Sequence, residues 1–209
     1  MSLAEMLWRE NQDLARQMLA HPFVRGIGRG TLPRSNFAAY IGQDAFFLDA
    51  FGRAYALAAA RSPDREGVPE FARLLNGVLE ELRLHATYAA RWGIDVLTVE
   101  PMEATLAYTD FLLKTAAFGS VGETCAAMTP CMRLYAYLGQ SLAADGVDDG
   151  NPYADWIHTY DAPEFEALAT TLERLLGRYG DERQGRTPYR RAMQLELAFF
   201  DAHGGGVES

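Results

Sequence analysis

Apolar residues recur every three or four positions along most of the chain, which is the period of an amphipathic α-helix. The segment 71–92 shows this most clearly, with Phe71, Leu74, Val78 and Leu82 on one face. The strict alternation that is typical of strands is weak throughout. The pattern therefore predicts an all-α protein, built as a single-domain helical bundle over residues 1–203 and followed by a flexible C-terminal tail at 204–209.

Glycines, prolines and polar runs divide this pattern into elements. We expect helices at residues 2–19, 37–60, 71–92, 101–118, 121–144, 153–160, 163–177 and 189–203, and loops at 26–33, 61–70, 145–152 and 180–186. Ser35 or Asn36 is expected to cap the helix that begins near residue 37. Thr187 is expected to cap the last helix, with Pro188 in its first turn.

One stretch of the long helix 121–144 stands out. Pro130 has no N–H to donate and crowds the preceding turn, so a helix that contains it is expected to kink or restart there. Cys131 follows directly, and Tyr135 lies one turn later on the same face. A thiol and a phenol on one face suggest a site. A buried cysteine that merely packs explains the same spacing, because free cysteine usually behaves as a small hydrophobe.

Polar residues also interrupt the apolar pattern elsewhere. Asp44 lies between Ile41 and Phe47 on a helix that is apolar around most of its circumference, and Glu196 is followed closely by two phenylalanines. Tyr160 closes the short aromatic segment 156–160. A buried carboxylate is costly without a partner, so each acid is expected to have either an ion-pair partner or a chemical role.

Composition and charge narrow the possible functions. The chain has 209 residues, of which 49% are hydrophobic and 22% charged, as in ordinary globular proteins. The net charge is −9 and Lys114 is the only lysine. Sequence-independent binding to phosphate backbones needs clustered basic side chains, so we expect no nucleic-acid partner. No apolar run is long enough to span a membrane, and the amino terminus lacks the apolar core of a signal peptide. We therefore expect a cytoplasmic protein without a membrane partner.

The remaining candidate motifs are weak. Cys125 and Cys131 are the only cysteines, and their spacing fits neither a redox pair nor a metal framework. Glu81 and His85 stand one helical turn apart and could share a metal ion, but a second ligand set is required and none is evident. The glycines at 26–30 lack a P-loop lysine. We therefore expect no bound metal.

Several motifs, taken in chain order, resemble the TenA/thiaminase II family. Each is weak alone, but their order and spacing match over nearly the whole chain. They are His21-Pro22-Phe23 with Gly30-Thr31-Leu32-Pro33, Tyr40-Ile41-Gly42-Gln43-Asp44, Pro130-Cys131-Met132-Arg133-Leu134-Tyr135, Trp156-Ile157-His158-Thr159-Tyr160 and Glu196-Leu197-Ala198-Phe199-Phe200.

This resemblance implies a heme-oxygenase-like helical bundle, usually a homotetramer, that hydrolyses pyrimidines of thiamin metabolism without a cofactor. The expected small-molecule substrates are 4-amino-5-aminomethyl-2-methylpyrimidine and thiamin itself. By position in the motifs, Cys131 would be the nucleophile and Glu196 the proton donor. The residues implied to bind the aminopyrimidine are Asp44, Tyr135 and Tyr160, with Tyr108 as a candidate to stack on its ring and Phe47 in the same pocket.

The implied chemistry suits these residue types. An amine on the 5-methylene of an aromatic pyrimidine leaves slowly until a nucleophile adds at C6 and makes the ring electron-rich. A soft thiolate can add there and depart afterwards. A carboxylic acid can protonate the leaving amine, which contributes typically ~10² to 10⁴ in rate.

The sequence departs from the family pattern at two positions. Phe47 stands where members commonly have a tyrosine that raises the reactivity of the cysteine, so Cys131 is activated by another group, or the enzyme is slower, or its pyrimidine differs. Phe200 stands where many members have tryptophan, which concerns packing more than chemistry. Two other functions remain open on this fold: a metal-dependent oxidase with ligands from Glu81 and His85, and a non-enzymatic regulator.

Overall fold

The chain folds into helices joined by short connections. The computed structural model describes residues 1–93 and 99–204, without the side chains of Leu84, His85, Tyr88, Arg91 and Trp92. The helices are α1 (Leu3–Glu10), α2 (Gln12–Leu19), α3 (Pro22–Arg29), α4 (Arg34–Ala60), α5 (Gly67–Trp92), α6 (Glu103–Phe118), α7 (Val121–Ala144), α8 (Ala154–Asp161), α9 (Pro163–Tyr179) and α10 (Glu182–Gly204). No strand occurs within these described ranges, so the predicted all-α class is confirmed.

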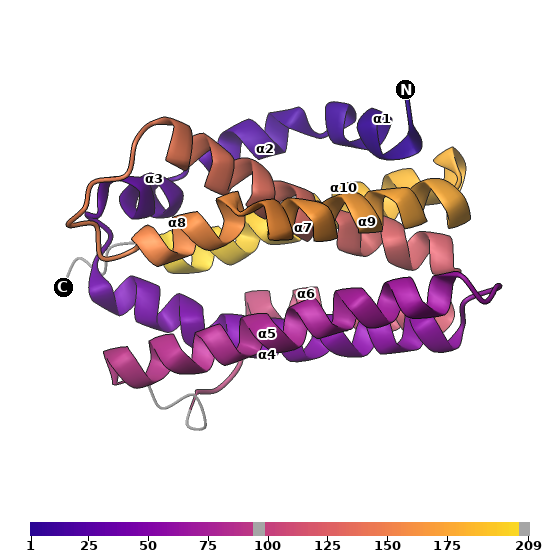
Figure 1. Ribbon diagram of the computed structural model, residues 1–209, viewed down its shortest axis with the longest axis horizontal. Helices are drawn as coiled ribbons and strands as arrows, with labels where there is room; N and C mark the ends of the chain where they lie inside the picture. The colour runs from indigo at the N-terminus through magenta and orange to yellow at the C-terminus, as the bar shows by residue number, and fades with distance from the viewer. Residues whose placement is uncertain (94–98, 205–209) are drawn as a thin grey trace.

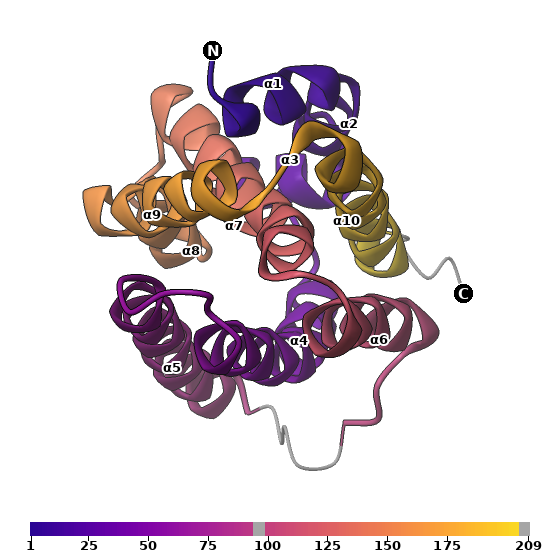
Figure 2. The same cartoon turned by 90° about the vertical axis from the view of Figure 1, so that its right-hand side faces the viewer.

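The helices form two stacked layers, and α7 is the central helix of one of them. Helices α4, α5 and α6 lie side by side as one layer, and α7 to α10 form the other (Figure 1). Seen along the helix axes, α7 lies in the middle, flanked by α8 and α9 on one side and α10 on the other, with α1 and α2 beyond it (Figure 2). This central position explains why α7 is apolar on nearly every face.

Local signals fix where α7 begins and how it passes its proline. The Ser120 hydroxyl accepts the Glu123 N–H at 3.1 Å, while the Glu123 carboxylate accepts the Ser120 N–H at 2.7 Å, which forms a capping box. The helix then runs through Pro130 as one element, so it does not restart there. Beside the proline, the Thr129 hydroxyl donates to the Cys125 carbonyl at 2.7 Å.

Two predicted loops are shorter than expected, because the capping residues lie within them: residues 30–33 and 180–181 are outside helices, and the rest of each segment is helical. The segment 26–33 was expected to be a loop, but α3 continues to Arg29 and ends only at Gly30, whose φ of 68° is left-handed. The segment 180–186 was also expected to be a loop. Asp181 accepts the N–H groups of the residues two and three positions later, so α10 begins at Glu182 and Pro188 lies inside it.

Two further boundaries differ from prediction. The predicted first helix is divided at Asn11, whose buried side chain bonds the Leu7 carbonyl at 2.8 Å and Arg190 at 3.2 Å. Helix α4 begins at Arg34, directly after Pro33, so neither Ser35 nor Asn36 is its cap. Of the predicted tail, residues 205–209 lie outside the described residues.

A partly buried ion-pair cluster joins α7 to α9. The Arg133 guanidinium donates to both oxygens of Glu166 at 2.9 Å and to those of Glu173 at 2.7 and 2.9 Å. Such two-pronged contacts fix relative orientation as well as distance. Arg133 therefore holds α9 against α7, which explains its place in the motif beside Cys131 without a role in the chemistry.

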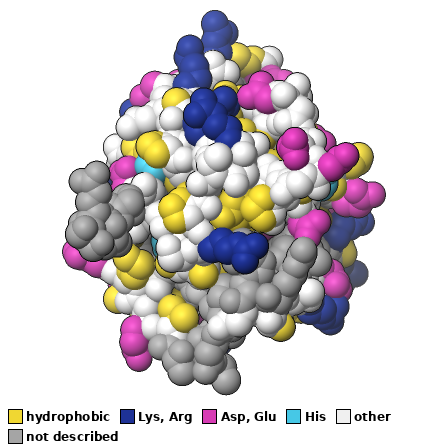
Figure 3. Space-filling view, turned by 90° about the vertical axis from the view of Figure 1, so that its left-hand side faces the viewer, with side chains coloured by type: hydrophobic (Ala, Val, Ile, Leu, Met, Phe, Trp, Pro, Cys, Tyr) yellow, Lys and Arg dark blue, Asp and Glu magenta, His cyan; other side chains and the backbone are white. Residues whose placement is uncertain are grey.

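The hydropathy of the described helices and the charges on the face in Figure 3 bear on whether the protein has a membrane or nucleic-acid partner. In the described part of the chain, no helix is long and apolar enough to cross a membrane. On the face shown in Figure 3, basic, acidic and hydrophobic side chains are interspersed.

Close packing of α7 on α8 depends on Gly139. A Cβ atom at this position would lie 2.6 Å from the carbonyl carbon of Tyr160 and 2.7 Å from the nitrogen of Asp161. Both are backbone atoms, so a side chain here would force α8 away from α7. Gly139 therefore sets the position of Tyr160 relative to Tyr135, one turn earlier on α7.

We predict that Gly139→Ala lowers the free energy of unfolding by about 1 to 3 kcal/mol, because it overpacks a helix contact. Urea unfolding measures the change. Gly177→Ala is the matched control: it lies in α9 with no atom within 4 Å of an added Cβ, so it should be neutral or stabilise by up to about 1 kcal/mol. Equal effects of the two substitutions would contradict this account.

Candidate active site

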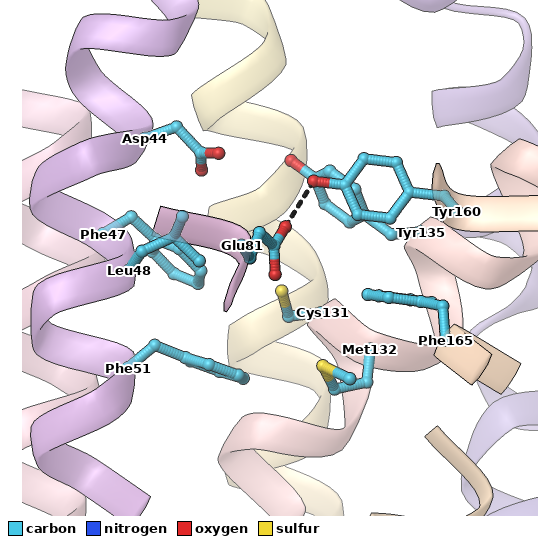
Figure 4. Close-up of a pocket in the computed structure, with 10 residues that line it drawn as sticks. All are labelled: Asp44, Phe47, Leu48, Phe51, Glu81, Cys131, Met132, Tyr135, Tyr160 and Phe165. Carbon is cyan, nitrogen blue, oxygen red and sulfur yellow. Dashed lines mark hydrogen bonds between the residues drawn. The ribbon is translucent and has the colours of Figure 1, made fainter. Parts of the chain in front are cut away.

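A narrow pocket opens between the two layers. Its lining residues come from five helices and are Asp44, Phe47, Leu48, Phe51, Glu81, Cys131, Met132, Tyr135, Tyr160 and Phe165 (Figure 4). The cavity volume is about 10 Å³, which is room for a single water molecule. A ligand as large as a pyrimidine ring therefore requires these side chains to move apart.

Five residues expected in the site line this pocket. Asp44 and Phe47 reach it from α4, Cys131 and Tyr135 from α7, and Tyr160 from α8 (Figure 4). Cys131 and Tyr135 do share one face, as their spacing indicated. The rings of Tyr135 and Tyr160 meet edge to face with centroids 4.8 Å apart, so the two phenols form one wall.

The two other expected residues lie behind the pocket wall. Glu196, from α10, is 2% exposed and accepts a hydrogen bond from the Cys131 thiol. The Tyr108 hydroxyl donates to Glu196 Oε1 at 2.8 Å, and the Tyr108 ring packs against Phe47 with centroids 4.7 Å apart. Tyr108 thus supports Glu196 and Phe47, whereas the resemblance implied that it stacks on the substrate.

Burial decides the protonation of the Cys131 and Glu196 pair. Burial raises the pKa of Glu196 to about 7, against the hydrogen bonds from Tyr108 and Cys131, which lower it. The pKa of the Cys131 thiol lies well above its usual range, first because it is buried and then because of the negative charges of Glu196, Glu81 and Asp44. At neutral pH the resting cysteine is a thiol, next to a carboxyl group poised to take its proton.

Asp44 is held in a network of aromatic groups. Burial raises its pKa well above the usual range, the charges of Glu81 and Glu196 raise it further, and a hydrogen bond with Tyr40 opposes them. The Tyr40 hydroxyl donates to the Tyr135 hydroxyl at 3.2 Å and accepts the Trp156 indole N–H at 3.3 Å. Tyr40 therefore orients both an acid and a phenol of the pocket.

Glu81 is a pocket residue that sequence reasoning did not place there. It was considered only as a metal ligand with His85, whose side chain lies outside the described residues. In the structure its Oε1 accepts the Tyr160 hydroxyl at 2.6 Å, and burial raises its pKa to about 7 (Figure 4). A signal was available, because Glu81 continues the apolar stripe of Leu74 and Val78 at helical spacing.

The described residues offer no clear metal site. No group of three or more His, Cys, Asp and Glu side chains among them is arranged to hold a metal ion. The three carboxyls near Cys131 instead have tyrosine hydroxyls as hydrogen-bond partners: Tyr40 for Asp44, Tyr108 for Glu196 and Tyr160 for Glu81.

The chain is similar in sequence to one known protein family over most of its length. The sequence model of the TENA/THI-4/PQQC family matches residues 8–202. The chain belongs to this family. An aminopyrimidine aminohydrolase of Halalkalibacterium halodurans is 35% identical over 205 residues, covering 96% of this chain and 90% of that protein. An aminopyrimidine aminohydrolase of Bacillus subtilis is 31% identical, covering 84% of this chain and 75% of that protein.

Solved structures of this family share the fold. The crystal structure of a TenA family transcription regulator from Silicibacter sp. TM1040 matches with a TM-score of 0.89 and 28% identity, over 98% of this chain and 97% of that one. A TenA homologue from P. horikoshii OT3 matches with a TM-score of 0.90 at 24% identity, over 98% of this chain and all of that one. The predicted heme-oxygenase-like bundle, as found in TenA proteins, is therefore confirmed.

The raised pKa of Glu196 predicts a pH-dependent stability. Its carboxyl binds a proton more tightly in the folded chain, with a pKa of about 7, than when unfolded, where the ordinary value is 4.5. The folded state therefore holds more protons between these pH values, and stability falls as the pH rises from about 5 to 7. We predict that Glu196→Gln removes about 3 kcal/mol of this decline.

Urea unfolding of the parent and of Glu196→Gln at pH 5 and pH 8 measures this difference. Part of the decline should persist in the variant, because the pKa of Glu81 is raised in the same direction. An identical decline in both proteins would show that Glu196 is not a proton-binding group of the folded state.

Proposed function

We propose that this protein is an aminopyrimidine aminohydrolase of the thiaminase II type, which converts 4-amino-5-aminomethyl-2-methylpyrimidine and water into the 5-hydroxymethyl compound and ammonia, with thiamin as a second substrate. The observation that carries the proposal is the Cys131 thiol bonded to Glu196 in a pocket that also contains Asp44 and two tyrosines. Relatives that carry the aminopyrimidine aminohydrolase name support it.

Asp44 can pair with the edge of the pyrimidine ring that carries the 4-amino group. Its raised pKa favours the neutral carboxyl, which has one O–H to donate and one oxygen to accept. The 4-amino group of the substrate donates an N–H, and the neighbouring ring nitrogen accepts one. A protonated Asp44 therefore pairs with this edge through two hydrogen bonds, and Tyr135 and Tyr160 supply hydroxyl groups for the rest of the ring.

Catalysis begins with transfer of the Cys131 proton to Glu196. The sulfur then forms a bond to C6, the C6–N1 π electrons move to N1, and N1 takes up a proton through solvent as the ammonium substituent of the substrate gives one up. This step ends the aromaticity of the ring and leaves the 4-amino nitrogen conjugated through C4 and C5 to the methylene carbon. Addition by a thiolate is the type of covalent step that divides one difficult displacement into easier ones.

The second half of the reaction exchanges nitrogen for oxygen. The 4-amino lone pair expels the amine, which carries the proton held by Glu196 and leaves as ammonia. Water adds to the exocyclic methylene and gives a proton to Glu196. The C6–S bond breaks as N1 loses its proton to solvent, which restores the aromatic ring, and the sulfur takes the proton from Glu196, which restores the Cys131 thiol. Glu196 thus acts first as a base and then as an acid, a role that a pKa of about 7 favours.

Because residue 47 is a phenylalanine and has no hydroxyl group, Glu196 is the group left to activate the Cys131 thiol. The Phe47 ring stacks on Phe51 with centroids 5.2 Å apart and packs against Tyr108, so it forms an apolar wall of the pocket. Among the described residues, the hydrogen-bond partner of the Cys131 thiol is Glu196. We infer that Glu196 supplies the activation that a tyrosine gives elsewhere in the family.

We further propose that the protein acts in the cytoplasm as a homotetramer, as the resemblance to TenA implies. Exposed apolar side chains on α5 and α6 support self-association, among them Leu79, Leu106 and Phe118, which is 85% exposed. A net charge of −9 argues against a role on DNA.

We predict that Cys131→Ser reduces ammonia release from the aminomethylpyrimidine at least about 10³-fold, because a hydroxyl is a far weaker nucleophile at the same position. Cys125→Ser is the matched control. Cys125 lies on the same helix, is fully buried and does not line the pocket, so its variant should retain near-parent turnover. Undiminished turnover in Cys131→Ser would refute covalent catalysis by this residue.

A further inference from the structure

Three carboxyl groups surround Cys131, and the described pocket lining contains no cation to balance them. Asp44 and Glu81 line the pocket (Figure 4). Glu196, which is outside the pocket lining, bonds the Cys131 thiol. Their charges act on one another, since Glu81 and Glu196 both raise the pKa of Asp44. None of the lining residues that the structure describes is Lys, Arg or His. A ligand that carries a positive charge would relieve this repulsion.

Glu81 is the most accessible of the three acids. Asp44 is 4% exposed and Glu196 2% exposed, whereas Glu81 is only partly buried. The Tyr160 hydroxyl bonds Oε1 of Glu81, and Figure 4 shows the carboxyl group directed toward the space between Cys131 and Tyr160. Among the three acids, Glu81 is therefore the one that is both part of the pocket lining and partly open to solvent.

The charge of the ligand changes during the proposed reaction. An aminomethyl substituent is protonated near neutral pH, as alkyl amines generally are, and the corresponding position of thiamin carries a permanently cationic ring. The hydroxymethyl product is neutral. Substrates and product thus share the pyrimidine ring and differ in the charge of the group on the methylene. A residue that recognises this charge would distinguish substrate from product.

We propose that Glu81 is a specificity-determining residue that binds the positive charge on the methylene substituent, so that the pocket prefers cationic aminomethylpyrimidines over the neutral hydroxymethyl product. This inference rests on the proposed function. It gives the third carboxyl a role distinct from those of Asp44 and Glu196. It also links binding to activation, because a bound cation offsets the negative charges that hold the Cys131 proton in place.

The test compares two ligands that differ only in this charge. For the parent and for Glu81→Gln, we would measure the KM of the aminomethylpyrimidine and the inhibition constant of the hydroxymethylpyrimidine. Loss of a charge-assisted hydrogen bond should raise the KM for the amine about tenfold or more, while the inhibition constant of the alcohol stays within about twofold. Glu81→Ala provides a second uncharged variant with the same expected loss of preference.

Two controls isolate the charge at this position. Glu80→Gln removes an exposed carboxylate one residue away, which pairs with Arg83 on the surface, and should leave both constants at parent values. Glu81→Asp retains the charge and should preserve more of the preference for the amine than Glu81→Gln. Circular dichroism shows whether each variant is folded.

The outcomes separate this inference from the proposed function. Equal weakening of both ligands in Glu81→Gln would mean that Glu81 acts only by positioning Tyr160, and an unchanged preference for the amine would mean that it does not bind the charge; either result overturns the inference alone. A parent protein that binds neither pyrimidine would overturn the proposed function, and this inference with it.

Discussion

The site depends on the burial of a thiol beside carboxyl groups. Removing Glu196 and Cys131 from water raises the pKa of both, so that at neutral pH the proton lies on sulfur and the carboxyl is near its midpoint. In water the carboxylate would be permanently ionised near neutral pH. Its raised pKa lets Glu196 both accept a proton from Cys131 and protonate the amine, whereas the raised pKa of the thiol opposes loss of the Cys131 proton, and a positively charged ligand offsets that opposition.

Helix packing supplies the geometry that this chemistry requires. Gly139 allows α8 to approach α7 closely enough for Tyr160 to meet Tyr135, and Arg133 fixes α9 on the same side of that helix. The layer formed by α4 and α5 contributes Asp44 and Glu81 from across the pocket. Each functional side chain thus stands on a helix held by its neighbours, which limits its freedom before a ligand binds.

Much of this arrangement was predictable from sequence, for identifiable reasons. Helical period gave the elements, and spacing placed Cys131 and Tyr135 on one face. Asp44 and Glu196 were recognisable as acids in apolar surroundings. Glu81 was recognisable only as an alternative metal ligand with His85, because its contact with Tyr160 joins residues 79 positions apart, which no local pattern shows. The misplaced start of α10 has a local cause: the capping side chain of Asp181 lies within a run that reads as a charged loop.

The central claim is that Cys131 forms a covalent bond to C6 of the pyrimidine, with Glu196 as the acid that completes the reaction. Carbon NMR of a C6-labelled analogue with no amine to lose, 4-amino-2,5-dimethylpyrimidine, bound to the parent protein tests it most directly. We expect the bound C6 resonance to move from the aromatic to the saturated region, and Cys131→Ser to abolish this species. A C6 resonance that stays aromatic in a parent protein that binds the analogue and turns over the substrate would contradict it.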